Sequence, residues 1–117
     1  MEPGTERMAT LTQLRRGALP NCVLAVIGEQ ERYGFELVKI LSERSGFSIS
    51  EGTIYPLLSR LRREGLVETT WQKSAEGPPR RYYALTSDGE LALATFRTAW
   101  VGFRDAVDDL LTTGNHS

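Results

Sequence analysis

The side chains best suited to chemistry in this 117-residue chain are cations concentrated in residues 59–81. That segment carries six basic and three acidic side chains, a net charge of +3, whereas the whole chain carries a net charge of -1. A local basic stripe is the footprint that phosphate binding leaves on a protein surface. The sequence therefore predicts contact with a nucleic-acid backbone, with a solvated surface of mixed charge as the alternative.

The side chains that enzymes and metal sites use most are nearly absent. The chain has one cysteine, Cys22, and one histidine, His116, so a disulfide, a Cys/His catalytic pair and a His-based metal site lack material. The uncharged stretch Gly17–Gly28 is shorter than the ~20 residues that span a bilayer, and it lacks the features of a signal peptide. We expect a cytoplasmic protein with no metal, no cofactor, no membrane partner and no enzymatic activity.

Three helices are predicted in the first 64 residues, and the third of them extends into the basic segment. They cover Leu19–Gln30, Gly34–Arg44 and, after the N-cap Ser50, a stretch that ends near Glu64 and stops at Gly65. Within the first of these, Cys22–Ile27 is short and β-branched, so a buried strand is the competing interpretation. Residues 1–13 are expected to form a flexible arm or a loosely attached helix.

After the third helix the apolar periodicity changes from 3.6 to 2, which predicts a β-hairpin. Its strands are Leu66–Lys73 and Arg81–Leu85, and its loop, residues 74–79, is rich in Gly and Pro. Tyr82 and Tyr83 must face opposite sides of the second strand, and we expect Tyr83 in the core. A fourth helix follows, capped by Thr86 or Ser87, and Ser87 and Glu90 have the spacing of a capping box.

This order of elements predicts a mainly α-helical fold with a small β-hairpin, of the α+β type. Residues 14–86 form a winged helix-turn-helix, in which the third helix enters the DNA major groove and the hairpin is the wing. Residues 87–112 form a long C-terminal dimerisation helix. Residues 113–117 are expected to be a disordered tail.

Three motifs in this order resemble the PadR family of transcriptional regulators: Tyr33–Leu37, Gly52–Leu58 and Gly77–Thr86. The chain is similar to the short subclass of that family, which has a single C-terminal helix. The resemblance implies a repressor that binds a pseudo-palindromic operator in double-stranded DNA as a homodimer. It also implies dimerisation through the C-terminal and N-terminal helices.

The candidate DNA-binding residues lie on the third helix and the wing. They are Gly52, Thr53, Tyr55, Ser59, Arg60 and Arg63 on the helix, and Lys73, Arg80 and Arg81 on the wing. Gly52 allows close approach to a phosphate, unless packing alone requires it, and Tyr55 can donate to a phosphate. Thr53 and Ser59, together with Glu51, are candidates for base contacts. The competing hypothesis is a winged-helix protein–protein interaction module without DNA binding, which the basic wing and the arginines of the third helix disfavour.

The fourth helix carries a heptad stripe of bulky residues that predicts a dimer interface. The stripe comprises Leu93, Phe96, Trp100, Phe103, Val107 and Leu110. In some multidrug-sensing relatives, a tryptophan at the matching place lines a cavity for flat aromatic ligands. By that resemblance, Trp100 and Phe96 could bind a small aromatic effector, and interface packing alone is the alternative.

Overall fold

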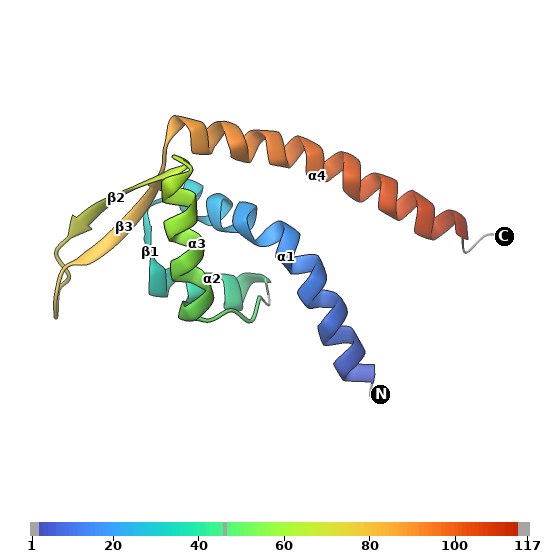
Figure 1. Cartoon of the computed structure of the whole chain (residues 1–117), viewed down its shortest axis with the longest axis horizontal. Helices are drawn as coiled ribbons and strands as arrows, with labels where there is room; N and C mark the ends of the chain where they lie inside the picture. Colours follow the sequence, from blue (N-terminus) through green and yellow to red (C-terminus); the bar gives the residue numbers. More distant parts are fainter. Residues whose placement is uncertain (1–2, 46, 115–117) are drawn as a thin grey trace.

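The computed structural model of the chain describes residues 3–45 and 47–114. Its elements are α1 (Pro3–Glu29), β1 (Arg32–Tyr33), α2 (Gly34–Ser45), α3 (Glu51–Arg63), β2 (Val67–Gln72), β3 (Arg80–Leu85) and α4 (Ser87–Gly114) (Figure 1). The predicted fold, a winged helix-turn-helix followed by a long helix, is confirmed. Among the described helices, none combines the length and apolarity that crossing a bilayer requires.

The first helix is much longer than the sequence predicts. It begins at Pro3, not at Leu19, and passes position 13 without interruption, so residues 3–13 are helical. Pro20 lies inside the helix, where it cannot donate a backbone hydrogen bond, and Figure 1 shows α1 changing direction between its two halves. In the early turns, the hydroxyls of Thr10 and Thr12 donate to carbonyl oxygens one turn back.

One apolar core joins the four helices to the sheet. It comprises Val23, Leu24, Val26 and Ile27 of α1, Leu37 and Leu41 of α2, Ile54, Leu57, Leu58 and Leu61 of α3, Val67 of β2, Tyr83 of β3 and Leu93 of α4. The predicted buried face of the third helix and the predicted core position of Tyr83 are therefore confirmed. The strand interpretation of Cys22–Ile27 is wrong, because these residues belong to α1.

The end of α3 is fixed by its backbone. Gly65 has a φ of 76°, its N–H donates to the carbonyl of Arg62, and the N–H of Leu66 donates to the carbonyl of Leu61. This pair of bonds is the Schellman arrangement that terminates helices at a glycine. The helix therefore stops where the sequence predicts, and the chain enters β2 at once.

The wing is the β2–β3 hairpin, to which β1 adds a third strand. All pairs are antiparallel in the order β1-β3-β2, and Arg32–Tyr33 pairs with Tyr82–Tyr83. β1 was not predicted from the sequence, because two residues are too few to show an alternating pattern. The rings of Tyr33 and Tyr82 meet edge to face at 5.3 Å, so β1 ties the wing to the start of α2.

Thr86 immediately precedes the last helix, α4, and its Oγ1 accepts the N–H of Gly89 at 3.0 Å. Thr86 is therefore the N-cap, and the predicted capping box of Ser87 and Glu90 is wrong because it is one residue out of register. The distal part of α4 and the N-terminal half of α1 extend away from the core (Figure 1). The predicted tail, 113–117, is helical at residues 113–114, and residues 115–117, with His116, lie outside the described part.

Candidate nucleic-acid interface

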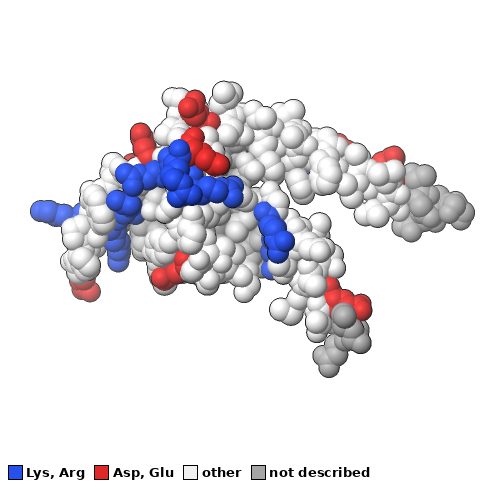
Figure 2. All heavy atoms as spheres, viewed as in Figure 1, with Lys and Arg blue, Asp and Glu red and all other residues white. Residues whose placement is uncertain are grey.

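The apolar stripe of α3 determines which of its side chains face outward. Because Ile54, Leu57, Leu58 and Leu61 are buried, the remaining positions are presented to solvent. The predicted DNA-binding residues of this helix are all exposed: Gly52, Thr53, Tyr55, Ser59, Arg60 and Arg63. Figure 2 shows Lys and Arg side chains gathered over the region where α3 meets the wing.

The structure gives no packing reason for a glycine at position 52. A Cβ there would meet only Ser50 Oγ, at an ordinary contact distance of 3.5 Å. The Ser50 side chain makes no capping hydrogen bond, although its carbonyl accepts the N–H groups of Thr53 and Ile54. The first turn of α3 is therefore open, as a close approach to a phosphate requires.

Tyr55 is packed more closely than the sequence suggests. Its ring lies on Gly34 at the start of α2, so closely that a Cβ at Gly34 would lie 2.7 Å from the ring carbon Cζ. The side chain remains 43% exposed, in agreement with the expected place on the polar face. Desolvation, followed by the charge of Glu51, raises the pKa of Tyr55 above its usual value, so its hydroxyl stays a hydrogen-bond donor at neutral pH.

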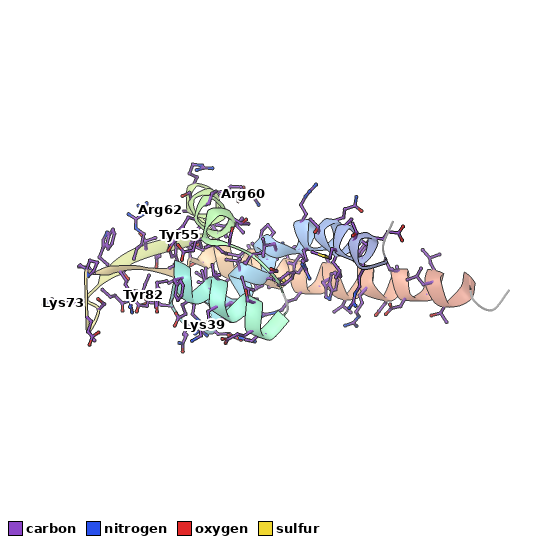
Figure 3. The ribbon with its side chains drawn as sticks, turned by 90° about the horizontal axis from the view of Figure 1, so that it is seen from below. Lys39, Tyr55, Arg60, Arg62, Lys73 and Tyr82 are labelled. Carbon is purple, nitrogen blue, oxygen red and sulfur yellow. The ribbon has the colours of Figure 1, made fainter. Side chains whose placement is uncertain are left out.

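The predicted cations Arg60 and Lys73 lie in different parts of the interface. Arg60 forms an exposed ion pair with Glu64, one turn along α3, with 3.7 Å between Nε and Oε1. Such a pair contributes only about 0.3–0.5 kcal/mol, so a phosphate can displace Glu64. Lys73 follows β2, and Figure 3 shows it far out along the wing from Arg60.

The two wing arginines each lie over an aromatic ring. The guanidinium carbon of Arg80 is 4.5 Å from the ring centroid of Tyr33, and that of Arg81 is 5.0 Å from that of Trp71. Trp71 and Arg81 are direct partners across β2 and β3. These contacts restrict where each positive charge can lie, so less side-chain entropy is lost when an anion binds.

The loop of the wing is closed by one side chain. Ser74 Oγ lies within hydrogen-bond distance of three carbonyl oxygens, those of Glu76 (2.8 Å), Gly77 (3.2 Å) and Pro78 (2.9 Å). Gly77 has a φ of 91°, which a residue with a side chain rarely adopts. The loop between Lys73 and Arg80 is thus braced by its own contacts.

A groove runs between α3 and the wing, and we call it the α3–wing groove. It has two hollows, one of about 460 Å³ lined in part by Tyr55, Trp71 and Arg80, and one of about 380 Å³. The second is lined by Ser59, Arg62, Arg63, Arg81 and Tyr83. Arg62 is a lining residue that the sequence analysis did not select. The spacing of Tyr55, Ser59 and Arg62 at i, i+4 and i+7 could have identified it, because that spacing places all three on the flank of α3 that faces the wing.

A second, apolar groove separates α1 from α4, and we call it the α1–α4 groove. It measures about 430 Å³ and is lined by Gln13, Leu14, Gly17 and Ala18 of α1 and by Phe96, Ala99, Trp100 and Phe103 of α4. The ring centroids of Phe96 and Trp100 are 6.2 Å apart, and those of Trp100 and Phe103 are 6.3 Å apart. The structure therefore brings the two predicted effector-binding residues into one groove.

The predicted dimer stripe divides into two parts. Leu93 is 5% exposed because it packs in the core of its own chain, which argues against its prediction as an interface residue. Phe96 and Val107 are half-buried, whereas Trp100, Phe103 and Leu110 are exposed. The apolar surface without a partner thus begins near Phe96 and continues toward the end of α4.

Metal binding finds no support in residues 3–45 and 47–114. No group of three or more His, Cys, Asp or Glu side chains in that part of the chain is placed to hold a metal ion.

Known proteins that resemble the chain have this architecture. A model of the transcriptional regulator PadR-like family matches residues 23–95. The transcriptional regulator Rv3488 of Mycobacterium tuberculosis is 35% identical over 89 residues, which cover 76% of this chain and 81% of that protein. A solved PadR-like transcriptional regulator from Bacillus cereus is 39% identical with a TM-score of 0.78, over 85% of this chain and 96% of that one. A PadR family transcriptional regulator from Eggerthella lenta is 33% identical with a TM-score of 0.83, over 92% and 94%.

Proposed function

Since the chain belongs to the PadR-like family of transcriptional regulators, we propose that it is a homodimeric repressor of a pseudo-palindromic operator. Membership of that family makes it a DNA-binding regulator of transcription and not an enzyme. Each protomer inserts α3 into the major groove of one half-site, and the wing follows the adjoining backbone. The twofold symmetry of such a dimer matches the symmetry of the operator.

The observation that carries this proposal is the gathering of positive charge on α3 and the wing (Figure 2). Exposed phosphate-binding candidates occupy the outer face of α3, and Arg80 and Arg81 lie over the rings of Tyr33 in β1 and Trp71 in β2. Thr53 and Ser59 on the same helix are short enough to reach base edges beside these cations. A module that binds proteins alone does not require this charge.

The support for a dimer is the apolar surface on α4 and α1. Trp100 is 43% exposed, Phe103 64% and Leu110 71%, and Leu14 of α1 is 66% exposed across the α1–α4 groove. A row of large apolar side chains on a helix that extends from the core typically marks an interface. A second copy of the chain fits this surface, because an isologous contact would place Trp100 and Phe103 against their own copies.

The α1–α4 groove favours a second element of the proposal, release of the operator by a flat aromatic effector. Its walls are apolar, and Phe96, Trp100 and Phe103 form a continuous row of rings along one side. Such walls suit a planar aromatic compound better than a sugar or an ion. A ligand that binds only one spacing of the dimer would shift the protein between operator-competent and incompetent states.

The proposed function is tested by binding duplex DNA at several salt concentrations. Affinity should fall steeply with salt, and it should fall at any fixed salt when the cations of α3 and the wing are removed. A protein that binds no duplex at low salt would refute the proposal.

A further inference from the structure

The second hollow of the α3–wing groove is lined by three arginines and by no acidic residue. It is lined by Arg62 and Arg63 of α3, by Arg81 of β3, and by Ser59 and Tyr83. Within residues 3–45 and 47–114, none of the three arginines has an ion pair within 4.0 Å or a side-chain hydrogen bond. Like charges held close together repel one another, and an anion seated between them relieves that repulsion.

We infer that the hollow formed by Arg62, Arg63 and Arg81 clamps a single phosphate of the DNA strand that passes between α3 and the wing. The inference rests on the proposed function, since it takes α3 to lie in the major groove. A protein with one element inside that groove and the wing beyond its edge must leave the bordering sugar–phosphate strand between the two. The hollow lies in that space, and its charge is opposite to that of the strand.

Guanidinium chemistry fits this occupant. Each arginine offers a planar fork of N–H donors that matches phosphate oxygens, and its charge persists at any physiological pH. The hydroxyl of Ser59 lines the same hollow and supplies a short neutral donor. Arg60 is excluded from the clamp, because it pairs with Glu64 and does not line the hollow.

Trp71 is a positioning residue for this clamp, because it orients Arg81. Its side chain is 65% exposed, which is costly for an indole, yet its ring carries the Arg81 guanidinium at 5.0 Å. The Nε atom of Arg81 is enclosed and has no hydrogen-bond partner among the described residues, and the Trp71 ring restricts where its guanidinium lies. Trp71 therefore acts on the phosphate through Arg81.

The test counts the phosphates that the three arginines neutralise. The probe is a short duplex of arbitrary sequence, and the slope of log affinity against log salt is measured for the wild type and for the triple variant Arg62→Gln, Arg63→Gln, Arg81→Gln. A clamp on one phosphate predicts that the slope falls by about 0.9 per bound protomer, whereas three separate phosphate contacts predict about 2.7. Lys39→Gln is the control, because Lys39 lies on α2 on the opposite side of the molecule from Arg62 (Figure 3).

The outcomes separate this inference from the proposed function. A wild-type slope near zero would refute DNA binding itself. A steep wild-type slope that the triple variant leaves unchanged, or lowers by about 2.7, would overturn the clamp and leave DNA binding intact. Urea unfolding of each variant identifies any change in slope that comes from loss of folded protein. In that case the single variant Arg62→Gln, exposed on α3, takes the place of the triple variant. A phosphate that Arg63 and Arg81 still hold predicts a fall well below 0.9, whereas a separate contact of Arg62 predicts a fall of about 0.9 and would overturn the clamp.

The role of Trp71 has a separate readout. Arg81→Gln should weaken binding about tenfold at fixed salt, and Trp71→Leu should do the same without adding to it in the double variant. Trp71→Tyr keeps an aromatic face and should restore the wild-type affinity. Losses that multiply in the double variant, or a failure of tyrosine to rescue, would show that Trp71 does not act through Arg81.

Discussion

Gly89, in the first turn of α4, lies directly against the backbone carbonyl of Leu66, so that a Cβ at position 89 would overlap its oxygen and lie 3.0 Å from its carbon. Thr86 reinforces the contact. Its N–H donates to the Leu66 carbonyl at 3.1 Å, and its hydroxyl donates to the Gly65 carbonyl at 2.6 Å. The end of α3, the start of β2 and the start of α4 therefore meet at one point, which joins α3 and the wing to α4.

We predict that Gly89→Ala destabilises the protein, because the obstructing atom belongs to the backbone and cannot rotate away. The expected loss is about 1–3 kcal/mol in the free energy of unfolding, measured by urea denaturation followed by circular dichroism. Gly102→Ala, also in α4, is the matched control. A Cβ at position 102 would meet no neighbouring group within 4 Å, and alanine favours a helix. Equal stability of the two variants would contradict the packing role of Gly89.

Gly34→Ala should act on DNA binding more than on folding. The added Cβ would overlap the ring of Tyr55, a half-exposed side chain that can swing outward. We expect weaker DNA binding with a loss of about 1 kcal/mol or less in stability, measured by fluorescence anisotropy and urea denaturation. In a Tyr55→Ala background the substitution should have no further effect, and a further loss there would show that Gly34 acts without Tyr55.

Phe103→Glu should abolish the dimer, because it would bury an unpaired charge among apolar rings. The cost is several kcal/mol, and sedimentation equilibrium should report monomers without operator binding. Thr98→Glu is the control, since Thr98 lies on the opposite face of α4 from the stripe of Phe96, Trp100 and Phe103. A wild-type protein that sediments at its chain mass of 13.1 kDa at micromolar concentration would rule the dimer out.

Planar aromatic compounds should quench Trp100 and weaken operator binding together. The chain has two tryptophans, so a Trp71→Phe background leaves Trp100 as the only reporter. Binding in the α1–α4 groove would place a ligand against the rings of Phe96 and Trp100, which explains both effects. If an aromatic panel leaves Trp100 unquenched, or quenches it without changing DNA affinity, Trp100 serves packing alone.

Much of the winged-helix core could be predicted because local signals agree there. Apolar spacing in Ile54–Leu61 and the stop at Gly65 define α3, and the motifs of this region resemble the family to which the chain belongs. The start of α1 could not be predicted in this way. Residues 4–18 contribute no buried side chain, so no apolar stripe in the sequence marks those turns as helical.

The parts of the site that were missed depend on contacts distant in sequence. Spacing along α3 shows that Arg62 is exposed, but not that β3 brings Arg81 to the same hollow. Likewise, the heptad of α4 assigns Leu93 and Trp100 to one stripe, although only the first reaches the core of its own chain. Periodicity identifies the face of a helix, whereas the partner of that face is set by tertiary packing.

The central claim, that α3 and the wing form the DNA interface, is tested most directly by the salt dependence of duplex binding. Arg60→Ala and Arg80→Ala lie outside the inferred clamp, and each should lower both the affinity and, by about 0.9 per bound protomer, the slope of log affinity against log salt. Lys39→Ala, on the opposite side, should change neither (Figure 3). Affinity and slope equal to the wild type in both arginine variants, or a comparable loss in Lys39→Ala, would contradict the account.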